Sequence, residues 1–577
     1  MNRTWQVRSH DASRVHDLAR RANLPSIIAQ LLVGRGFEDP DEVSAFLEAS
    51  PMGLHDPKLL PGVTEGAKRV IEAIEKGETI LIHGDYDVDG VTGTAILVRA
   101  LRLLGGRVEW HIPNRLTDGY SFGPHSLEVA QRLGATLVIS VDNGTSAHAV
   151  IAELASHGID TVVTDHHEPP DGPLPQAIGI VNPKLHGSTY PFRELCGGAV
   201  AFKFAWGLAQ AIEGTSRVRP EIKSFLEDAT ALVAIATVCD VVPLLDENRV
   251  FARFGLKALE TTSHPGLRAL LAKCSLTGRR LTGDDVGFQI GPRINASGRL
   301  GSAKTAVELL LADDIEEARR LAAKLDELNV ERKRIESDVL VEARAQAREF
   351  ADRDEHPILV LGGDDWHMGV VGIVAARLTE EFGRPAVVIG THDGVARGSA
   401  RTIEGFNVLE AMKGAADVFE RFGGHAQAAG CELDPARISE ARDAMESRTR
   451  EILASAPLEA PALEIDSEIA FEDMTPELMR QLDRLEPYGQ ENERPLLLAR
   501  AVHLEAPPRI LGRDQTHLML RLRRGNHTLK AMAFGMAKRA GELRLGSRID
   551  LVFRPKWNTF RGETNLEVEL VDFRGSA

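Results

Sequence analysis

Short apolar runs alternate with amphipathic segments between about residues 78 and 183. The runs ETILIHG, ATLVISVD and DTVVTDHH are separated by segments such as VTGTAILVRALRLLG, whose apolar residues recur at helical spacing. Apolar strands that alternate with amphipathic helices are typical of a buried parallel sheet with right-handed crossovers. The pattern therefore predicts an α/β domain with a parallel sheet, which we assign to residues 61–312.

A highly charged stretch at 313–351 contains neither Gly nor Pro. Its apolar residues recur at helical spacing, among them Leu321, Leu325, Leu328, Ile335 and Val339. This pattern predicts a long, exposed helix that connects two domains. The runs PILVLGG, GVVGIVAARLTEEFG and PAVVIG follow it and predict a second, smaller α/β domain at 352–454.

Apolar and polar positions alternate with period two in the last part of the chain. The stretch SAPLEAPAL at 455–463 is rich in Pro and Ala and predicts a linker. The runs HLMLRLR, LKAMAF, IDLVFRPKW and NLEVELVDF follow, and several short strands of this kind predict a small OB-type β-barrel at 464–577. Residues 1–60 are assigned to an N-terminal helical extension.

Length and composition exclude several classes of protein. A chain of 577 residues is too long for one core, and 43% hydrophobic and 26% charged residues are ordinary globular values. No apolar run approaches the length of a membrane span, and the first residues do not resemble a signal peptide. The four cysteines have no zinc-like spacing, so we expect buried thiols in a reduced, cytoplasmic protein without a membrane partner.

The charge is distributed unevenly. The formal net charge is −16, yet residues 508–562 carry thirteen Lys or Arg against three acidic residues. Four aromatic residues, Phe534, Phe553, Trp557 and Phe560, are interspersed among these arginines. A basic barrel with aromatic residues fits a single-strand binding surface, with phosphate contacts and base stacking. The alternative, that the aromatic residues fill the barrel interior, is expected for at least two of the four.

Three acidic clusters follow the predicted strands. They are HGDYDVDG (83–90), SVDNG (140–144) and TDHHEPP (164–170), and together they contain five Asp and three His. One Asp at a strand end is usually a turn or cap residue. Ligands of open parallel sheets bind where the strands end, however, and so many charges there would repel one another without a cation. Mixed carboxylate and imidazole ligands suit Mn²⁺ or Mg²⁺.

A fourth acid, Asp240, ends the apolar helical run AIATVCD. A carboxylate is unfavourable near the negative end of a helix dipole unless something compensates for it, so we interpret Asp240 as a ligand that completes the metal site. The chain has no P-loop and no evident Ser-His-Asp set. The sequence therefore offers no evident covalent or NTP-driven alternative to chemistry at the metal site.

These four motifs, in this order, resemble the DHH phosphoesterase superfamily. The runs GPRINASGRL (291–300), WHMGVVGIVAARL (366–378), ARGSAR (396–401) and FGGHAQAAG (422–430) narrow the resemblance to its bacterial exonucleases specific for single-stranded DNA. The resemblance implies a DHH-type parallel-sheet domain joined by a long helix to a DHH-associated (DHHA1) α/β domain, plus the C-terminal barrel. It covers nearly the whole chain.

The resemblance also implies two divalent cations, Mn²⁺ or Mg²⁺, and a role for each residue. One ion would be bound by His83, Asp87 and Asp142. The second would be bound by Asp89, Asp142, His166 and Asp240, with Asp142 bridging the two ions. Asp85 and Asp165 would orient their neighbours, and His167 would contact the phosphate. The catalytic residues would be Asp87, Asp89, Asp142, His166, His167 and Asp240.

The substrate is implied to be single-stranded DNA, degraded from 5′ to 3′ in recombination and repair. Its backbone and 5′ end would be held by Arg115, Arg299, Ser399, Arg401, Gly423, Gly424 and His425. A single-strand-binding protein and a helicase are expected partners of a monomeric enzyme. A DHH enzyme for pyrophosphate, short oligoribonucleotides or cyclic dinucleotides needs neither the long helix nor a basic barrel. A non-catalytic DNA-binding subunit would be expected to lose the ligands.

Overall fold

The computed structural model describes residues 4–114, 118, 122–350, 352, 355–458, 462–560 and 563–576. The chain divides into two compact units. One consists of His55–Asp240 and Phe254–Glu459, and the other of Met1–Leu54, Val241–Arg253 and Ala460–Ala577. None of the helices in the described ranges is both long and apolar enough to cross a membrane.

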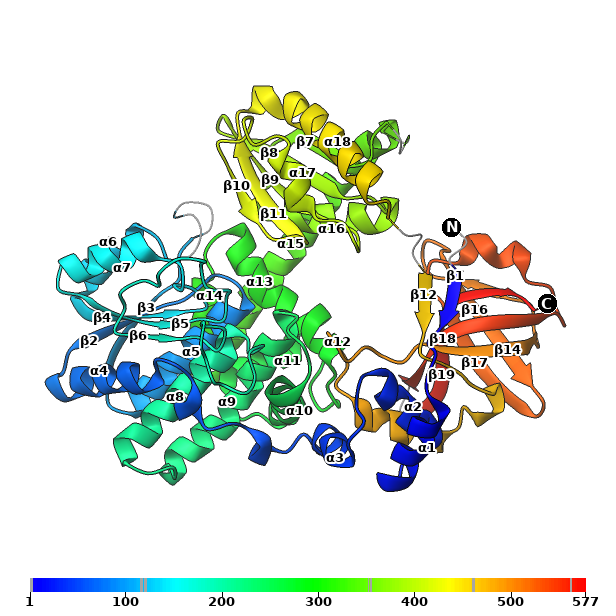
Figure 1. Cartoon of the computed structure of the whole chain (residues 1–577), viewed down its shortest axis with the longest axis horizontal. Coiled ribbons are helices and arrows are strands. Elements are labelled where there is room, and N and C mark those ends of the chain that lie inside the picture. The colour runs from blue at the N-terminus through cyan, green and yellow to red at the C-terminus, as the bar shows by residue number, and fades with distance from the viewer. Residues whose placement is uncertain are drawn as a thin grey trace. The chain divides into compact units, whose positions relative to one another are not determined.

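A parallel five-stranded sheet in the order β3-β2-β4-β5-β6 forms the centre of the first unit. Strands β2, β4 and β5 are almost fully buried, as their apolar runs predict, whereas the edge strand β3 is partly exposed. Helices α6 and α7 cover one face, and α4, α5 and α8 cover the other (Figure 1). The strands are β2 (Thr79–His83), β3 (Arg107–His111), β4 (Ala135–Val141), β5 (Asp160–Thr164) and β6 (Gly179–Val181), and the helices are α4 (Val63–Lys76), α5 (Val88–Leu103), α6 (His125–Leu133), α7 (His148–Ser156) and α8 (Gly197–Glu213).

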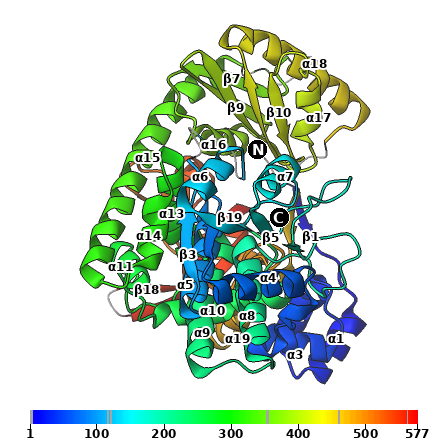
Figure 2. The ribbon, with the colours of Figure 1, turned by 90° about the vertical axis from the view of Figure 1, so that its left-hand side faces the viewer.

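Further helices extend this domain and lead into the predicted long helix, α15 (Ile315–Glu349). The carboxylate of Asp314 caps α15 by accepting hydrogen bonds from the backbone N–H groups of Glu316 and Glu317. Leu321, Leu325 and Val339 are buried on α15, which lies against other helices along its length (Figure 2). The helices that precede α15 are α9 (Pro220–Cys239), α10 (Asp246–Glu260), α11 (Pro265–Lys273), α12 (Gly283–Asp285), α13 (Gly291–Leu300) and α14 (Lys304–Leu311). The first part of α10, up to Arg253, belongs to the other unit.

The second sheet of this unit is mixed, in the order β10-β11-β9-β8-β7, with only β7 and β8 parallel. Strands β9, β10 and β11 carry the glycine-rich motifs of the sequence. The strands are β7 (Leu359–Asp364), β8 (Ala386–His392), β9 (Val395–Arg401), β10 (Arg421–Gly424) and β11 (Ala428–Leu433), and the helices are α16 (Val371–Phe382), α17 (Val408–Lys413) and α18 (Ile438–Ser455).

The second unit contains a closed β-barrel, because β14 pairs both with β18 and with β16. The predicted fold class, two α/β domains and an OB-type barrel, is therefore confirmed. The elements are β12 (Ala462–Ile465), β13 (Ser467–Glu468), β14 (Leu497–Leu504), β15 (Arg509–Leu511), β16 (His517–Arg524), β17 (His527–Ala533), β18 (Arg548–Phe560), β19 (Glu563–Gly575) and helix α19 (Pro476–Leu482).

The N-terminal residues belong to this barrel unit. The predicted helical extension contains α1 (Ala12–Arg21), α2 (Ser26–Gly34) and α3 (Pro40–Glu48), but it starts with a strand, β1 (Thr4–Val7), that pairs with β12. Helices α1 to α3 share one hydrophobic core with the barrel. Sequence periodicity identifies the helices but cannot show that their partner lies about 450 residues further along the chain.

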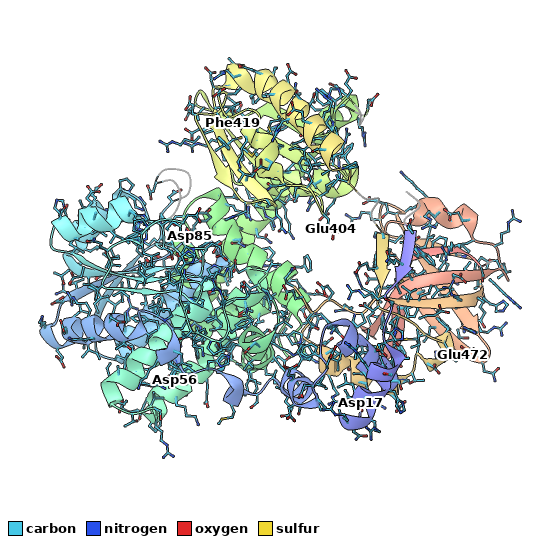
Figure 3. The ribbon with its side chains drawn as sticks, viewed as in Figure 1. Asp17, Asp56, Asp85, Glu404, Phe419 and Glu472 are labelled. Carbon is cyan, nitrogen blue, oxygen red and sulfur yellow. The ribbon has the colours of Figure 1, made fainter. Side chains whose placement is uncertain are left out.

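The basic character of the barrel is weaker than the sequence suggests. Acidic residues outside 508–562 approach its cations, as Glu567 does with Lys530 (2.9 Å) and Glu505 with Arg521 (2.7 Å). Glu472, labelled in Figure 3, pairs with Arg524 at 3.3 Å. The fold brings these carboxylates to cations that are distant in sequence. Only part of the +10 charge of this segment therefore remains uncompensated.

The barrel aromatic residues have different environments. Phe553 is buried in the core, and Trp557 is half-buried and donates from Nε1 to Asp483 (3.0 Å). Phe534 is 48% exposed, and the Nζ of Lys556 lies 5.1 Å from its ring centroid. The side chain of Phe560 lies outside the described part of the structure. Among the described aromatic residues of this set, Phe534 is the one available for base stacking.

Candidate metal centre

The turn between β2 and α5 presents three carboxylates at the carboxyl end of the sheet. Asp87 caps α5, with its Oδ1 accepting from the N–H groups of Asp89 (3.0 Å) and Gly90 (3.2 Å). Asp85, labelled in Figure 3, precedes it in a turn that meets α13, where Asn295 accepts from the N–H of Val88 (3.2 Å). Helix capping therefore fixes the direction of this acidic turn.

Asp89 is held by a second helix. Its two carboxylate oxygens accept hydrogen bonds from the backbone N–H groups of Gly197 (2.6 Å) and Gly198 (2.7 Å), at the N-terminus of α8. A helix N-terminus favours an anion there. Sequence reasoning did not identify these two glycines, although a Gly-Gly pair at the start of a helix is a known sign of close backbone approach.

Asp142 follows β4 in a left-handed conformation, with φ +62°, that Asp tolerates better than most residues. Its N–H donates to Thr164 O at 2.9 Å. A Cβ added at Gly197 would lie only 2.7 Å from Oδ1 of Asp142. Gly197 therefore has two roles: its N–H binds the carboxylate of Asp89, and its lack of a side chain leaves room for the carboxylate of Asp142.

His166 faces three carboxylates from different elements. Its Nε2 lies 3.2 Å from Oδ1 of Asp142, 3.6 Å from Oδ2 of Asp240 and 3.7 Å from Oδ2 of Asp89. Burial lowers the pKa of His166 to about 3, so the imidazole is neutral and has a lone pair to offer a cation. Asp240, at the end of α9, thus joins the other ligands from a distant part of the sequence.

The electrostatics of this cluster require a cation. Burial, followed by the neighbouring carboxylates, raises the pKa of Asp89 to about 7 and that of Asp240 to about 9. The same causes raise the pKa of Asp142 well above its ordinary value. Buried like charges are unfavourable unless compensated, and a bound cation reverses such shifts. The donor set of carboxylate oxygens and neutral imidazole fits Mn²⁺ or Mg²⁺.

Three groups of possible ligands occur at this centre, each with ligand atoms within 4.8 Å of one another: Asp85, Asp87 and Asp142; Asp89, His166 and Asp240; and Asp142, His166 and His167. The second group contains three of the ligands expected for one ion, and Asp142 belongs to the first and third groups. The first group differs from the expectation, because Asp85 occupies the place assigned to His83.

His83 is grouped with two other histidines rather than with the carboxylates. Its Nε2 is 3.1 Å from Oγ of Ser126 on α6, and its imidazole is grouped with those of His111 and His125. His83 is the last residue of β2 and, in register with His111 on β3, shares a sheet face with it. The alternation of side chains along β2 turns the His83 ring to the sheet face that carries His111. The HxDxD spacing of the sequence alone does not reveal this direction.

Asp165 and His167 form a hydrogen-bonded pair at the edge of the centre. Burial alone would raise the pKa of Asp165, but the hydrogen bond from Nδ1 of His167 (2.7 Å) and that from Thr145 N hold it below its ordinary value. In return, Asp165 raises the pKa of His167 to about 9. His167 is therefore a half-exposed imidazolium at neutral pH, suited to contact a phosphate oxygen.

The expected substrate residues of the second domain lie on three adjacent strands. Gly423 on β10 is in register with Gly430 on β11, and Gly430 with Ser399 on β9. Nη1 of Arg401 donates to Oγ of Ser399 (2.9 Å), close to Gly372 at the start of α16. Gly424 and the exposed His425 end the strip, which has few large side chains.

The two other expected substrate arginines are placed differently. Nη1 of Arg299, near the end of α13, donates to the carbonyl of Gly369 at 3.2 Å. Arg299 therefore links the helix to the loop before α16. Arg115 lies outside the described residues.

A Gly197→Ala substitution is expected to reduce hydrolysis by about 10²-fold, since a displacement of about 1 Å at a reacting centre can have this effect. The new methyl group would overlap the carboxylate of Asp142. Initial rates on a labelled single strand at saturating Mn²⁺ measure the loss. Gly172→Ala is the matched control, since its added Cβ meets nothing within 4 Å. Equal rates for both variants would contradict this role.

Three family models match the chain. They are described as the DHH family N-terminal domain (residues 79–237), the DHHA1 domain (355–451) and the RecJ OB domain (465–572). Together with the acidic and histidine cluster at the strand ends, these matches define a DHH-type protein with a metal centre and an appended OB domain.

Relatives and solved structures narrow this class. The chain is 36% identical to the single-stranded-DNA-specific exonuclease RecJ of Bacillus subtilis, over 98% of this chain and 70% of that protein. It is 33% identical to RecJ of Escherichia coli K12, over 98% and 99% of the two chains. The Thermus thermophilus RecJ structure in complex with Mn²⁺ matches with a TM-score of 0.82 and 31% identity, covering 100% of this chain and 80% of that chain. The chain belongs to the RecJ family.

Proposed function

We propose that this protein is a metal-dependent exonuclease that hydrolyses single-stranded DNA from the 5′ end in recombination and repair. The convergence of His166 with Asp89, Asp142 and Asp240 carries this proposal. Relatives that are similar over almost their whole length bear the name of single-stranded-DNA-specific exonucleases. Contact with a single-strand-binding protein or a helicase, and a monomeric state, stay predictions.

The proposed ligands are Asp85, Asp87 and Asp142 for one cation, and Asp89, Asp142, His166 and Asp240 for the other. When bound, two such cations polarise the scissile phosphate and lower the pKa of a water molecule. The protein positions the ligands through two helix N-termini, because α5 is capped by Asp87 and α8 binds Asp89. The proposed role of His167 is to donate a charged hydrogen bond to the phosphate, kept protonated by Asp165.

The second domain supplies a surface for the DNA backbone in this proposal. The strip of Gly423, Gly430 and Ser399 allows a phosphate to approach the sheet closely. Arg401 and the N-terminus of α16 add positive charge beside it. A terminal phosphate bound here would set the end from which cleavage begins.

A direct test uses a single strand labelled at either its 5′ or its 3′ end. With Mn²⁺ or Mg²⁺ present, the 5′ label is expected to be released as a mononucleotide first, while the 3′-labelled strand shortens gradually. Duplex DNA and pyrophosphate serve as alternative substrates. Early loss of the 3′ label would overturn the polarity, and faster hydrolysis of pyrophosphate would favour a small-substrate enzyme.

Arg401→Ala is expected to weaken the use of 5′-phosphorylated strands about 10- to 100-fold, because a charge-assisted hydrogen bond contributes about 1.5–3 kcal/mol. Strands with a 5′ hydroxyl should be affected less. The kcat/KM values for the two kinds of end measure the difference. Arg448→Ala removes an exposed arginine of α18, paired with Glu451, and is the control. Equal losses for both ends would place Arg401 on an internal phosphate.

The barrel is proposed to hold long strands through its uncompensated cations. Arg509 and Arg513 are exposed, and neither makes an ion pair with a described residue. Replacing both with Ala should make the slope of log affinity against log salt shallower by about 1.4, at ~0.7 per phosphate of a single strand. Arg521→Ala is the control, since Glu505 already pairs with this residue. A slope unchanged by the double substitution would argue against DNA binding at β15.

Point substitutions test the barrel better than its removal. Truncation after Leu463 is the simpler design suggested by the sequence, because every proposed metal ligand precedes Val241. It would, however, leave the N-terminal helices without the core that they share with the barrel. The loss of binding could then not be separated from unfolding of residues 4–54.

A further inference from the structure

A cluster of three histidines lies beside the acidic centre and is not used by the proposed reaction. His83 ends β2, His111 ends β3, and His125 begins α6. One ligand atom from each lies within 4.8 Å of those of the other two. The ring centroids are 5.2, 5.4 and 5.7 Å apart.

Four of the six imidazole nitrogens of this cluster have no hydrogen-bond partner among the described residues. Nδ1 of the fully buried His83, Nε2 of His111 and both ring nitrogens of His125 are buried without a hydrogen bond. Buried polar atoms normally have a hydrogen-bond partner or a ligand, so four such atoms in one cluster need an explanation. The contact of His83 Nε2 with Ser126 fixes the orientation of the ring, as partners of metal-binding histidines do.

The spacing suits a tetrahedral ion. With Zn–N distances of about 2.0–2.1 Å, three imidazoles around one zinc ion have ring centroids roughly 5 Å apart. Burial lowers the pKa of His111 to about 4 and also lowers that of His125, so these rings carry no proton that a metal would have to displace. An all-imidazole set favours Zn²⁺ over Mg²⁺ and Mn²⁺, which prefer oxygen ligands.

We propose that His83, His111 and His125 form a binding site for a zinc-class divalent cation, separate from the acidic centre. The site joins β2, β3 and the first turn of α6. A cation there would hold together the sheet edge from which the acidic turn 84–87 leaves. This proposal does not depend on the exonuclease activity.

The test measures Zn²⁺ binding in the Asp142→Asn background, in which the acidic centre is impaired. The metal-free protein is expected to bind one Zn²⁺ per chain after dialysis, and Co²⁺ should give the visible absorption of a four-coordinate nitrogen site. Zn²⁺ should also raise the melting temperature. Adding His111→Gln and His125→Gln should abolish the stoichiometric binding, the spectrum and the shift, whereas an excess of Mg²⁺ should change none of them.

His186→Gln is the matched control, because this histidine is exposed and makes no hydrogen bond to a described residue. It should keep the bound ion. If the double variant does not fold, His125→Gln alone is the variant to use, because it changes only the first residue of α6. It is expected to weaken the affinity for Zn²⁺ at least tenfold. If the histidine variants still bind one Zn²⁺ per chain, the ion binds elsewhere and the proposal is wrong. If the parent protein binds no Zn²⁺, the cluster is a packed group of neutral histidines and the proposal is likewise wrong.

Discussion

Asp142→Asn is expected to lower the rate of hydrolysis by about 10³-fold or more. A metal centre provides several kcal/mol of transition-state stabilisation, and about 1.4 kcal/mol corresponds to a factor of ten. Asp142 belongs to the ligand group with Asp85 and Asp87, and its Oδ1 lies 3.2 Å from Nε2 of His166 in the other group. Asn is the suitable replacement, since it tolerates the left-handed conformation at φ +62° better than Ala. Single-turnover rates over a range of Mn²⁺ concentrations measure the effect.

The same variant should not be less stable than the wild type in the presence of a chelator. Burial and the charges of Asp89 and Asp87 raise the pKa of Asp142, so the metal-free fold loses stability relative to the unfolded chain as the pH rises above the ordinary pKa of a carboxyl group. Melting temperatures at pH 8 with chelator test this point. Asp171→Asn, an exposed loop residue, is the control for both measurements. Near wild-type turnover in Asp142→Asn with saturating metal would remove the two-cation proposal.

Arg249→Met is expected to destabilise the barrel unit by about 4 kcal/mol. The guanidinium is almost fully buried, and it donates to the backbone carbonyls of Phe46 (2.6 Å) and Leu485 (2.9 Å) and, through Nη2, to those of Arg484 and Glu486 (3.1 Å each). A buried carbonyl that loses its donor costs about 1–3 kcal/mol, and some of these groups will relax or reach water. The stacking of Arg249 on the Phe46 ring (3.8 Å) would be lost as well.

Urea unfolding followed by limited proteolysis measures this effect, and cleavage within residues 4–54 should appear at lower denaturant concentration. Arg544→Met, at an exposed position of the same unit, should change stability by no more than about 0.5 kcal/mol. Cleavage of short single strands should persist in both variants, because the proposed ligands lie in the other unit. Equal stability of Arg249→Met and the control would contradict the prediction.

The features that depend on local pattern can be predicted from the sequence. The apolar runs of β2, β4 and β5, the uninterrupted helix α15 and the alternating strands of the barrel all follow from residue periodicity. The position of Asp87, Asp142 and Asp165 just after strands also placed the acidic residues correctly at one edge of the sheet, because parallel strands end on the same side.

Which of these residues meet depends on contacts that the local pattern does not encode. The tertiary structure groups His83 with His111 and His125, places Gly197 against Asp142, and pairs Arg521 and Lys530 of the barrel with Glu505 and Glu567. It also joins residues 4–54 to a core formed by the last part of the chain. Such contacts depend on strand register, side-chain direction and packing between distant segments, whereas periodicity records only the environment of each residue along its own element.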